Sequence, residues 1–581
     1  MVNTMRVVLD IETNLAHDKI HVVVTKDIDT GEVRTWKQAS NLLEYLKGVS
    51  LIVMHNGISF DAPVLNRLWK TKIRLNQVYD TLIVSRLLDP SREKGHSLEA
   101  WGNTLATEHG LGLHKIDYAA VWQWMMDRPE EYKNECFDNP IDSLLEHYCI
   151  RDVEVTAKLY LQLVSEFNQK EFSLESLELE QSVAAIIAKQ ERNGFKLDQI
   201  YTTCLLTDIK SKMAGIYERM QQRWPPVTVE RYSEKRPGTR LKDSVVTFNP
   251  GSRQQIGEKL KELGWKPKLF TPTGHPIVDE GVLATVKIPE AQIIAEYLML
   301  SKRVAQIESW LLAVRKDGRV HGKVITNGAV TGRMTHSSPN MAQIPNSSSI
   351  YGPECRECWT VEDGNVLVGC DASGLELRML AHYMKDQDYV RTVTEGSSKD
   401  GTDVHTVNQR AAGLSTRDNA KTFIYAFLYG AGDAKIGSIV GGNAKAGAKL
   451  KANFLGQTPA LAKLIDKVKG LASKGYLPGL DGRRIWVRSE HAALNTLLQG
   501  AGAIVMKKAL VLFDNKVNAN KWNVKYVANV HDEAQLECPR DIAEDVGKAF
   551  KQSIIEAGEH FKLRCPLDGQ YKIGNNWRET H

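Results

Sequence analysis

Apolar positions along the chain indicate buried strands in three places and helices between them. Short apolar runs at residues 6–9, 51–54 and 366–370 each lead into an acid or a turn, as buried strands do. From about residue 173 apolar residues recur at helical spacing, break at Asn193-Gly194, and resume as a long amphipathic segment to Trp224. Residues 526–538 predict two tight strands with His531-Asp532 at their turn. The pattern predicts an α/β protein.

One segment, residues 417–430, carries chemistry at a helical period. Arg417, Lys421, Tyr425 and Tyr429 recur every fourth residue, and Gly430 follows. On an α-helix these side chains share one slowly drifting face. Two cations there can hold a polyphosphate, and the two rings can stack on a base. Taken alone, the segment also fits an amphipathic core helix with two solvated cations.

Two carboxylates in the C-terminal half of the chain flank this helix in sequence. Asp371 ends an apolar strand, and Asp532 lies at the turn of the predicted strand pair. An acid that ends an apolar strand has little value for packing. Together Asp371 and Asp532 are expected to hold two Mg²⁺ ions at a phosphoryl-transfer site, with Glu533 as a weaker candidate ligand.

A second set of acids lies in the N-terminal third. Asp10 and Glu12 point to one face of a strand, Asp61 follows the next strand, and Tyr148 and Asp152 lie one helical turn apart. Four hard oxygen donors can hold two divalent cations that cleave a phosphodiester, and Tyr148 would orient the attacking water. Any one of these acids alone is more often a solvated charge or a helix cap.

Two polar residues of the N-terminal third, near these acids in sequence, are expected to be structural. Asp80 precedes a predicted helix and should cap it, and His55 should pack locally rather than bind metal.

In the middle of the chain, Ser252 is a candidate N-cap of another helix. The exposed backbone N–H groups there and Arg253 could bind a backbone phosphate or could simply be solvated.

Length and composition fit a multidomain protein without excluding a nucleic-acid partner. The 581 residues predict three or more domains, and the net charge of +5 is mild. Eight scattered cysteines suggest reduced thiols, and Cys355-x2-Cys358 could form only half of a zinc site. The N-terminus lacks signal-peptide features, and no run is expected to span a bilayer, so a cytoplasmic location is expected.

Four motifs together resemble family A DNA polymerases, and in particular the replicative polymerases of short-tailed bacteriophages. These are R-x3-K-x3-[F/Y]-x3-Y-G at 417–430, D-x-S-x-x-E-L-R at 371–378, V-H-D-E at 530–533, and the ordered acids D-x-E, N-x3-F-D and Y-x3-D. The resemblance implies an RNase H-like 3′–5′ exonuclease domain (1–185) before a right-hand polymerase. Its expected parts are a thumb (186–315), a split palm (316–400 and 501–581) and fingers (401–500).

The resemblance also implies roles for individual residues. Arg417, Lys421 and His405 would bind the triphosphate, and Lys421 would also assist the leaving group. Tyr425, backed by Glu376, would exclude a ribose 2′-OH and favour ready acceptance of dideoxynucleotides. Tyr429 would stack at the templating position.

Several residues are expected to contact DNA. Arg333 and Gln499 would test base-pair geometry through minor-groove acceptors that all four correct pairs present. Gln343, His531 and Arg253 are further candidates for contacts with the duplex.

Cofactors and partners follow from the same resemblance. Two Mg²⁺ ions are expected at each site, with Mn²⁺ as a substitute, and the partners are primer–template DNA, dNTPs and a replicative helicase-primase. Some phage members carry a long basic thumb insertion that docks host thioredoxin. Only residues 225–245 stand at that place here, so thioredoxin is not expected. No membrane partner is expected, and a phage enzyme would act in the host cytoplasm.

Two other classes remain open from the sequence. The chain could be a degradative nuclease whose C-terminal half only grips nucleic acid, which nucleotide incorporation would exclude. It could also be a non-catalytic binder of primer–template DNA, which metal-dependent turnover would exclude.

Overall fold

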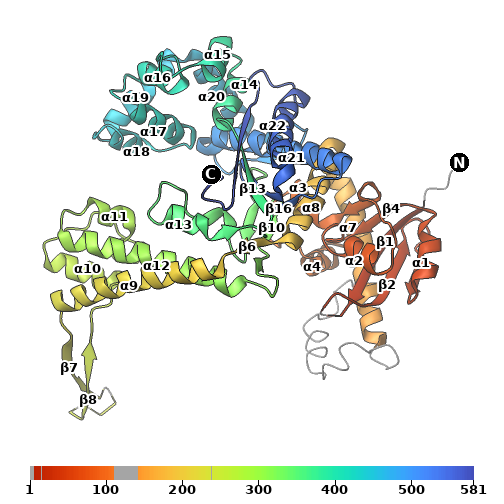
Figure 1. Cartoon of the computed structure of the whole chain (residues 1–581), viewed down its shortest axis with the longest axis horizontal. Helices are drawn as coiled ribbons and strands as arrows, with labels where there is room; N and C mark the ends of the chain where they lie inside the picture. The colour runs from red at the N-terminus through yellow and green to blue at the C-terminus, as the bar shows by residue number, and fades with distance from the viewer. Residues whose placement is uncertain (1–4, 15, 110–141, 234, 237) are drawn as a thin grey trace.

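The computed structural model describes residues 5–14, 16–109, 142–233, 235–236 and 238–581. These residues form an N-terminal lobe, a long helical arm and a C-terminal body from which a second helical lobe projects (Figure 1). We refer to them by the expected names of exonuclease domain, thumb, palm and fingers.

The exonuclease domain is built on a five-stranded mixed sheet in the order β3-β2-β1-β4-β5. The central strand β1 is antiparallel to β2 and parallel to β4. Its strands are β1 (Met5–Thr13), β2 (Ile20–Asp27), β3 (Val33–Trp36), β4 (Val49–Met54) and β5 (Val78–Asp80). Its helices are α1 (Ala39–Leu46), α2 (Asp61–Leu68), α3 (Thr81–Leu88), α4 (Leu98–His109) and α7 (Asp142–Gln169).

Asp80 organises the edge of this sheet that carries α2 and α3. As predicted, its carboxylate caps α3 by accepting from the backbone N–H of Leu82 and Ile83. It also accepts from the N–H of Asn56 and Ile58, both at 3.0 Å, and so fixes the turn that leads into α2. His55 contacts Thr81 Oγ1 at 2.9 Å, in agreement with a packing role.

A single helix, α8 (Leu174–Asn193), joins the exonuclease domain to the palm. Ser173 caps its start, and Gly194, at φ 63°, ends it where the sequence predicted a break. On one side, the Gln181 amide bonds to the backbone of β5, at Asp80 N and Val78 O. On its other side, α8 packs on α21 and β16 of the palm. The expected domain boundary at residue 185 therefore falls inside a helix shared by both halves.

The thumb is a pair of long helices with smaller elements at its far end (Figure 1). Its elements are α9 (Gln199–Arg223), β7 (Val227–Tyr232), β8 (Arg240–Val246), α10 (Arg253–Glu262), α11 (Glu280–Thr285) and α12 (Pro289–Ala313). The predicted exposed tip at 231–242 belongs to a two-stranded hairpin, β7–β8, whose side chains are largely exposed. Ser252 caps α10 as predicted.

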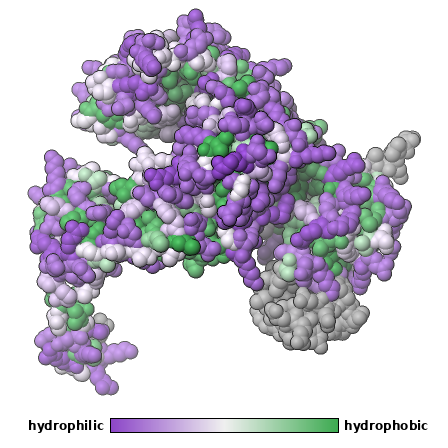
Figure 2. Space-filling model, viewed as in Figure 1, coloured by the Kyte–Doolittle hydropathy of each residue, from purple (hydrophilic) through white to green (hydrophobic). Residues whose placement is uncertain are grey.

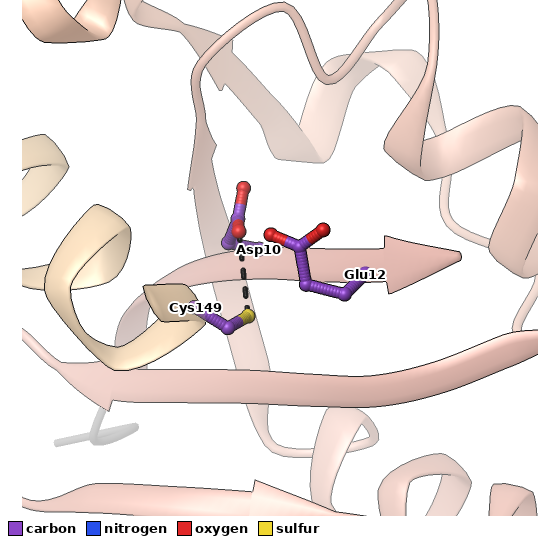
Figure 3. Close-up of side chains that lie close together, drawn as sticks. All are labelled: Asp10, Glu12 and Cys149. Atoms are coloured by element: carbon purple, nitrogen blue, oxygen red, sulfur yellow. Dashed lines mark hydrogen bonds between the residues drawn. The ribbon is translucent and has the colours of Figure 1, made fainter. Parts of the chain in front are cut away.

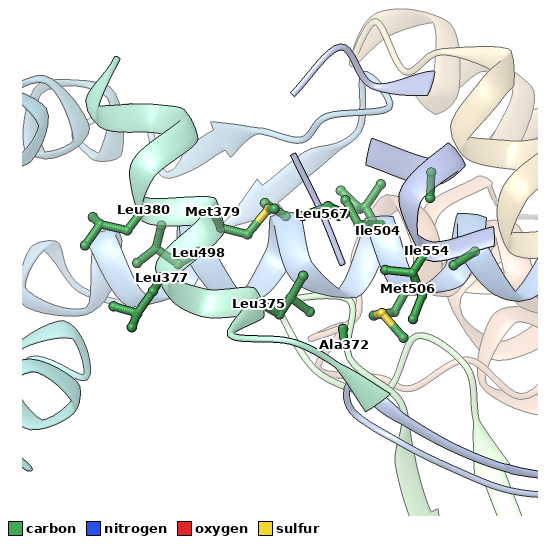
Figure 4. Close-up of a cluster of buried hydrophobic side chains, with 14 of the residues drawn as sticks. Ala372, Leu375, Leu377, Met379, Leu380, Leu498, Ile504, Met506, Ile554 and Leu567 are labelled. Atoms are coloured by element: carbon green, nitrogen blue, oxygen red, sulfur yellow. The ribbon is translucent and has the colours of Figure 1, made fainter. Parts of the chain in front are cut away.

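The palm sheet has the order β16-β17-β13-β18 and is antiparallel throughout. Its strands are β13 (Asn365–Ala372), β16 (Lys525–Val530), β17 (Glu533–Pro539) and β18 (Gly569–Gly574), and its helices are α14 (Leu375–Met384), α21 (Ala493–Asn520) and α22 (Ala543–His560). Buried side chains from α14, α21 and α22 form one apolar cluster around the strands (Figure 4). Burial of this apolar surface drives the assembly of segments far apart in sequence.

Short elements connect the palm to the thumb. They are β6 (Phe195–Leu197), β9 (Arg319–Val320), β10 (Lys323–Ile325), β11 (Thr335–Ser337), α13 (Gly352–Glu357) and β12 (Trp359–Thr360). Trp310, Trp359 and Trp577 are fully buried beside Phe195 at this junction.

The fingers are mostly helical. Their elements are α15 (Gln387–Glu395), α16 (Val404–Ala412), α17 (Arg417–Leu428), α18 (Asp433–Ser438), α19 (Ala444–Gln457), α20 (Pro459–Ala472), β14 (Tyr476–Pro478) and β15 (Arg484–Trp486). Phe423 and Phe454 anchor α17 on α19 with their rings edge to face at 5.1 Å.

The expectation that no segment is long and apolar enough to span a bilayer is not met by one helix, judged by its length and composition. Within the described residues, the helical stretch Glu490–Asn520 is long and apolar enough to span a bilayer, with a mean hydropathy of 1.4. However, 72% of that window is buried in the protein, because α21 is the central helix of the palm.

The cysteine pair behaves as core rather than as a zinc site. Cys355 and Cys358 are fully buried, and burial raises the pKa of each thiol to about 12. Zinc requires thiolates, so these protonated thiols are poor ligands. All the cysteines within the described ranges are free, and Cys136 lies outside them.

A buried ion cluster fastens α8 to the palm and the fingers. The Glu180 carboxylate, which has no exposed surface, accepts from Arg483 of the β14–β15 turn and from Lys507 of α21. Arg483 also donates to Asp481, at 2.6–3.0 Å. Removing one member of such a cluster leaves the opposite charges buried without compensation.

We therefore predict that Glu180→Gln destabilises the palm–exonuclease junction by about 3–5 kcal/mol. The change retains the size of the side chain but removes the charge that balances Arg483 and Lys507. The measurement is the urea midpoint of unfolding followed by tryptophan fluorescence. Glu178→Gln, an exposed position on the same helix, is the matched control. Equal midpoints for the two variants would contradict the prediction.

Candidate active sites

The palm sheet brings together the two acids that flank the fingers in sequence. In the β13–β17 pairing Asp371 lies opposite Glu533, and the N–H of Ala372 donates to the carbonyl of Asp532 at 3.1 Å. Burial raises the pKa of Asp371 to about 6, and repulsion by Asp532 adds to the rise. The two carboxylates therefore lie close enough for the charge of one to affect the pKa of the other, and their positions at strand ends had predicted that they would meet.

The turn that carries Asp532 also brings His531 next to Arg333. His531 adopts a left-handed conformation, with φ 59°, which closes the two-residue turn. His531 and Arg333 line one small pocket with Glu533. Burial lowers the pKa of His531, and the nearby Arg333 cation lowers it further.

The C-terminal end of the chain supports Glu533. The indole N–H of Trp577 donates to Glu533 Oε1, and the His581 ring contacts Oε2 at 3.1 Å. Trp577 is buried and anchors the terminus. With these partners Glu533 is held in place beside the two aspartates, consistent with a secondary role.

Helix α17 presents the predicted cationic and aromatic face. Thr416 caps its start, and Lys421 is exposed in the middle. Arg417 forms a two-pronged ion pair with Asp403, at 2.8 and 3.0 Å. Although partial burial opposes the change, this pairing lowers the pKa of Asp403 to about 2.

His405 lies beside this face. Its ring is 6.2 Å from that of Tyr425, and its Nδ1 atom is buried without a hydrogen-bond partner. Burial lowers the pKa of His405, as do the cations Arg417 and Lys421. A neutral imidazole in this position can still donate a hydrogen bond to an anionic ligand.

The contact of Glu376 differs from the expected one. The Tyr429 hydroxyl, not that of Tyr425, donates to Glu376, at 2.8 and 2.9 Å. Arg333 approaches the same carboxylate at 3.4 Å. Tyr425 stacks on Tyr429 with ring centroids 6.4 Å apart. Tyr429 reaches Glu376 because it is the C-cap of α17, where the helix ends and the chain turns.

Gly430 permits that turn. It has φ 72°, and a Cβ added there would lie 2.9 Å from the carbonyl of His491. A larger residue would therefore meet both backbone strain and a clash.

The other expected DNA contacts lie on separate elements. Gln499 is partly exposed on α21, Gln343 is exposed in a short 3₁₀ turn (Met341–Gln343), and Arg253 is exposed at the start of α10. The space-filling view shows a hollow between the fingers and the thumb (Figure 2). A hollow bounded by both lobes is a suitable place for an extended ligand.

The exonuclease domain gathers its own acids at the end of β1. Asp10 and Glu12 lie on one face of β1, Asp61 begins α2, and Asp152 lies on α7. Burial raises the pKa of Asp10, and repulsion from the other three carboxylates raises it further. Burial raises the pKa of Asp61 to about 7, with Asp152 adding to the shift. All four predicted acids thus share one site.

Tyr148 and Cys149 cover this site from α7. Tyr148 is only 3% exposed and lies one turn before Asp152. The Cys149 thiol donates to Asp10 Oδ2 at 3.3 Å, next to Glu12 (Figure 3). Burial raises the pKa of Cys149, so the group acts as a protonated donor rather than as a metal ligand.

Both acid clusters fit divalent cations. Burial raises the pKa of Asp10, Asp61 and Asp371, and repulsion from neighbouring carboxylates adds to each rise. Hard oxygen donors of this kind match Mg²⁺ or Mn²⁺, whose charge would relieve the repulsion.

Sequence reasoning missed two contacts. Asp403, the partner of Arg417, and Cys149, the donor to Asp10, were not singled out for those roles. The only signal in the sequence was position: Asp403 lies two residues before His405, and Cys149 directly follows Tyr148. Position alone does not show what either side chain contacts, because Arg417 and Asp10 belong to other elements.

Taken together, a split palm sheet with paired carboxylates, a cationic helix and a flanking hollow define a nucleotidyl-transferring polymerase. The sequence profile of DNA polymerase family A matches residues 233–579. The DNA-directed DNA polymerases of Enterobacteria phage T3 and Escherichia phage T7 are each 34% identical to the chain and align with 99% of it and with all of their own length. The chain belongs to DNA polymerase family A, whose activity is template-directed DNA synthesis.

A solved structure shares the fold. The polymerase domain of Pol1 from M. smegmatis, in complex with DNA primer-template and dNTP, superposes with a TM-score of 0.77 at 18% identity. The match covers 99% of this chain and 96% of that one. The predicted α/β architecture with a right-hand polymerase is therefore confirmed, and members of this family use divalent metal ions.

The raised pKa of Asp371 predicts a pH-dependent metal requirement. Below pH about 6 the Asp371 carboxyl holds a proton that competes with the cation, whereas above it the carboxylate is free to bind. We expect the Mg²⁺ concentration for half-maximal DNA synthesis to rise about tenfold per pH unit below 6 and to change little between pH 7 and 8. Metal titrations of primer extension at each pH test this, and a requirement independent of pH down to 5 would contradict it.

Proposed function

We propose that this protein is the replicative DNA polymerase of a phage and that it also proofreads. It adds nucleotides from dNTPs to a primer 3′-OH, and it removes mispaired nucleotides with a separate 3′–5′ exonuclease site. The observation that carries the proposal is the β13–β17 pairing, which joins Asp371 to Asp532 across the whole of the fingers in sequence.

Asp371 and Asp532 would hold two Mg²⁺ ions at the polymerase site, and Mn²⁺ would substitute for them. Such ions supply Lewis-acid chemistry that activates the primer hydroxyl and neutralises the triphosphate. Glu533, fixed by Trp577 and His581, keeps a third carboxylate close by without taking the place of either aspartate.

The face of α17 would bind the incoming nucleotide. Lys421, exposed in mid-helix, stabilises negative charge that develops on the leaving pyrophosphate. Arg417 binds the γ-phosphate after exchanging its ion pair with Asp403, and His405 donates to the same phosphates. The resting pair therefore keeps Arg417 oriented towards the site before the nucleotide arrives.

Tyr425, Tyr429 and Glu376 would check the sugar and the template. The Tyr425 ring covers the sugar and base, and Glu376 blocks a 2′-hydroxyl. The Tyr429 ring occupies the templating position while its hydroxyl bonds to Glu376, so the template base must displace that ring. The hydrogen bond between Tyr429 and Glu376 therefore couples entry of the template base to selection of the sugar of the incoming nucleotide.

The duplex would lie in the hollow between the fingers and the thumb. Arg333, His531 and Gln499 face its minor groove near the primer end, and Gln343 and Arg253 meet the backbone further along. Because minor-groove acceptors are common to all correct pairs, these contacts test geometry rather than sequence.

The exonuclease site would use Asp10, Glu12, Asp61 and Asp152 to hold two Mg²⁺ ions. Tyr148 orients the attacking water, and the Cys149 thiol keeps one oxygen of Asp10 directed by its hydrogen bond. The raised pKa values of Asp10 and Asp61 support a site built to be neutralised by cations.

Primer–template DNA and dNTPs are the proposed partners, with a replicative helicase-primase at the fork and a place of action in the host cytoplasm. Thioredoxin is not proposed. Among the described residues between α9 and α10, the β7–β8 hairpin is the only regular element. The alignment with the T3 enzyme spans 716 positions, so more than a hundred of its positions have no counterpart in these 581 residues.

If the polymerase and exonuclease sites are independent, a substitution in one site should remove one activity and leave the other. Asp532→Asn should slow primer extension by about 10²–10³-fold or more while leaving excision of a mispaired 3′ nucleotide intact. Asp10→Ala should have the converse effect. Gel assays of both activities on one labelled primer–template measure the two rates. Loss of both activities in a folded single variant would refute separate sites.

Tyr425 predicts ready use of dideoxynucleotides, because its hydroxyl can replace the hydrogen bond that a 3′-hydroxyl would make. Tyr425→Phe should increase discrimination against ddNTPs by about 10²-fold, the range that one hydroxyl contact provides. The ratio of kcat/KM for dTTP and ddTTP measures it. Tyr476→Phe removes a hydroxyl in β14, away from the face of α17, so it is the control and should leave the ratio unchanged. Equal ratios for wild type and Tyr425→Phe would contradict the prediction.

A further inference from the structure

The loop that carries Arg333 is held against the exonuclease domain. It joins β10 to β11, and its first residues, Thr326 and Asn327, are less than a tenth exposed. The side-chain amide of Asn327 donates to the backbone carbonyl of Arg86, on α3, at 3.1 Å. Figure 1 shows α3 close to α8 and β10, where the two halves meet. A side chain of the polymerase half therefore bonds directly to a helix of the nuclease.

The bond from Asn327 caps the C-terminal end of α3. The last carbonyls of an α-helix have no partner within the helix. The residue four positions after Arg86 is Pro90, which has no N–H to donate. The Arg86 carbonyl accepts from Asn327 instead, and the Leu88 carbonyl accepts from the indole N–H of Trp486, in β15, at 3.0 Å. Two side chains of the polymerase half thus complete a helix of the exonuclease domain.

The same Asn327 side chain lies against the turn directly before Arg333. A Cβ added at Gly332 would lie 3.2 Å from Asn327 Oδ1 and 3.4 Å from Arg483 Nη1. Gly332 has φ 74°, and its N–H donates to the carbonyl of Ala329 at 2.8 Å. The turn fits between these two side chains because residue 332 has no side chain of its own. A shift of the Asn327 amide would therefore move the turn, and Arg333 with it.

Stability alone does not explain Asn327. Its Oδ1 atom is buried, and no donor among the described residues reaches it. A buried acceptor without a donor lowers the stability of the folded protein. The amide is therefore better explained by the position that it gives to the loop.

The direction of the Arg333 side chain depends on its loop. Its guanidinium approaches Glu376 at 3.4 Å, which is long for a hydrogen bond between charged groups. The side chain is 24% exposed, so a ligand can reach it. Because the contact with Glu376 is weak, the backbone that carries Arg333 has to set where the guanidinium points.

We propose that Asn327 is a positioning residue of the polymerase site. By bonding to the end of α3, it holds the loop so that Arg333 meets the minor-groove acceptor of the terminal primer base. The inference rests on the proposed role of Arg333 and deepens it. The exonuclease domain then supports the base-pair check of the polymerase site, whether or not its own acids are active.

The test removes the minor-groove acceptor from the DNA. Two primer–templates differ only at the terminal primer guanine, whose N3 atom is replaced by C–H in one of them. The replacement retains Watson–Crick pairing and removes the acceptor that Arg333 would contact. All the proteins carry Asp10→Ala so that the primer ends persist, and the protein with this change alone is the parent. kcat and KM for the next dNTP are measured on both primers.

We expect the parent to lose about 10- to 100-fold in kcat when N3 is replaced, the effect of one hydrogen bond to a charged group. Arg333→Ala should be equally slow on both primers. Asn327→Ala should be slow on the normal primer, and replacement of N3 should then cost less than about threefold, because the guanidinium is misplaced. KM for the dNTP should change little, because α17 is untouched.

Two further variants separate positioning from general loosening of the junction. Asn327→Asp keeps the size of the side chain but cannot donate to the Arg86 carbonyl, so it should behave as Asn327→Ala does, and it provides the test if the alanine variant does not fold. Trp486→Phe is the matched control. It removes the other hydrogen bond to the end of α3, from outside the Arg333 loop, and should retain the full dependence on N3. Thermal unfolding midpoints identify the folded variants.

The outcomes separate this inference from the role of Arg333. If the parent extends both primers equally, or if Arg333→Ala retains the full loss, Arg333 does not contact N3, and this inference fails with that role. If the parent and Arg333→Ala behave as expected but a folded Asn327 variant retains the full loss, the inference alone is overturned. It is also overturned if Trp486→Phe loses the dependence on N3 as Asn327→Ala does, since the effect would then come from a looser junction.

Discussion

The antiparallel pairing of β13 with β17 is the constraint on which the polymerase site depends. It joins strands about 160 residues apart, with the entire fingers region folded between them. Its register places Asp371 opposite Glu533 and next to Asp532. A slip of one residue would turn the aspartate side chain into the core and bring apolar side chains to the surface, so burial of the sheet enforces the register. β18 pairs on the other side of β13 and brings the chain terminus to the same site.

Helix α8 joins this site to the nuclease by polar contacts that are costly to bury. Its neighbouring residues Glu180 and Gln181 contact opposite halves of the protein, the first through Arg483 and Lys507 and the second through the backbone of β5. A buried ion cluster is weak evidence of stability, but it tolerates few alternative geometries. Its role here is to fix how the two halves meet.

Much of the fold and of both acid clusters follows from local sequence patterns. Apolar strands that end in acids identify Asp10, Glu12 and Asp371, and the two-residue turn identifies Asp532. Caps such as Asp80, Ser173 and Ser252 are encoded in a few neighbouring residues. Partners are harder to predict, because they depend on packing. The sequence suggested that Glu376 would support Tyr425, but the end of α17 brings the Tyr429 hydroxyl to it instead.

By itself, then, the sequence determined which residues are candidates for the chemistry, because periodicity, capping and strand ends are local properties. Only the tertiary structure decided which of these residues meet. Asp403 pairs with Arg417, and Cys149 donates to Asp10. The physical reason is that a contact between distant segments is set by how the cores pack and which charges they bury together, and neither is written in the spacing of any one segment.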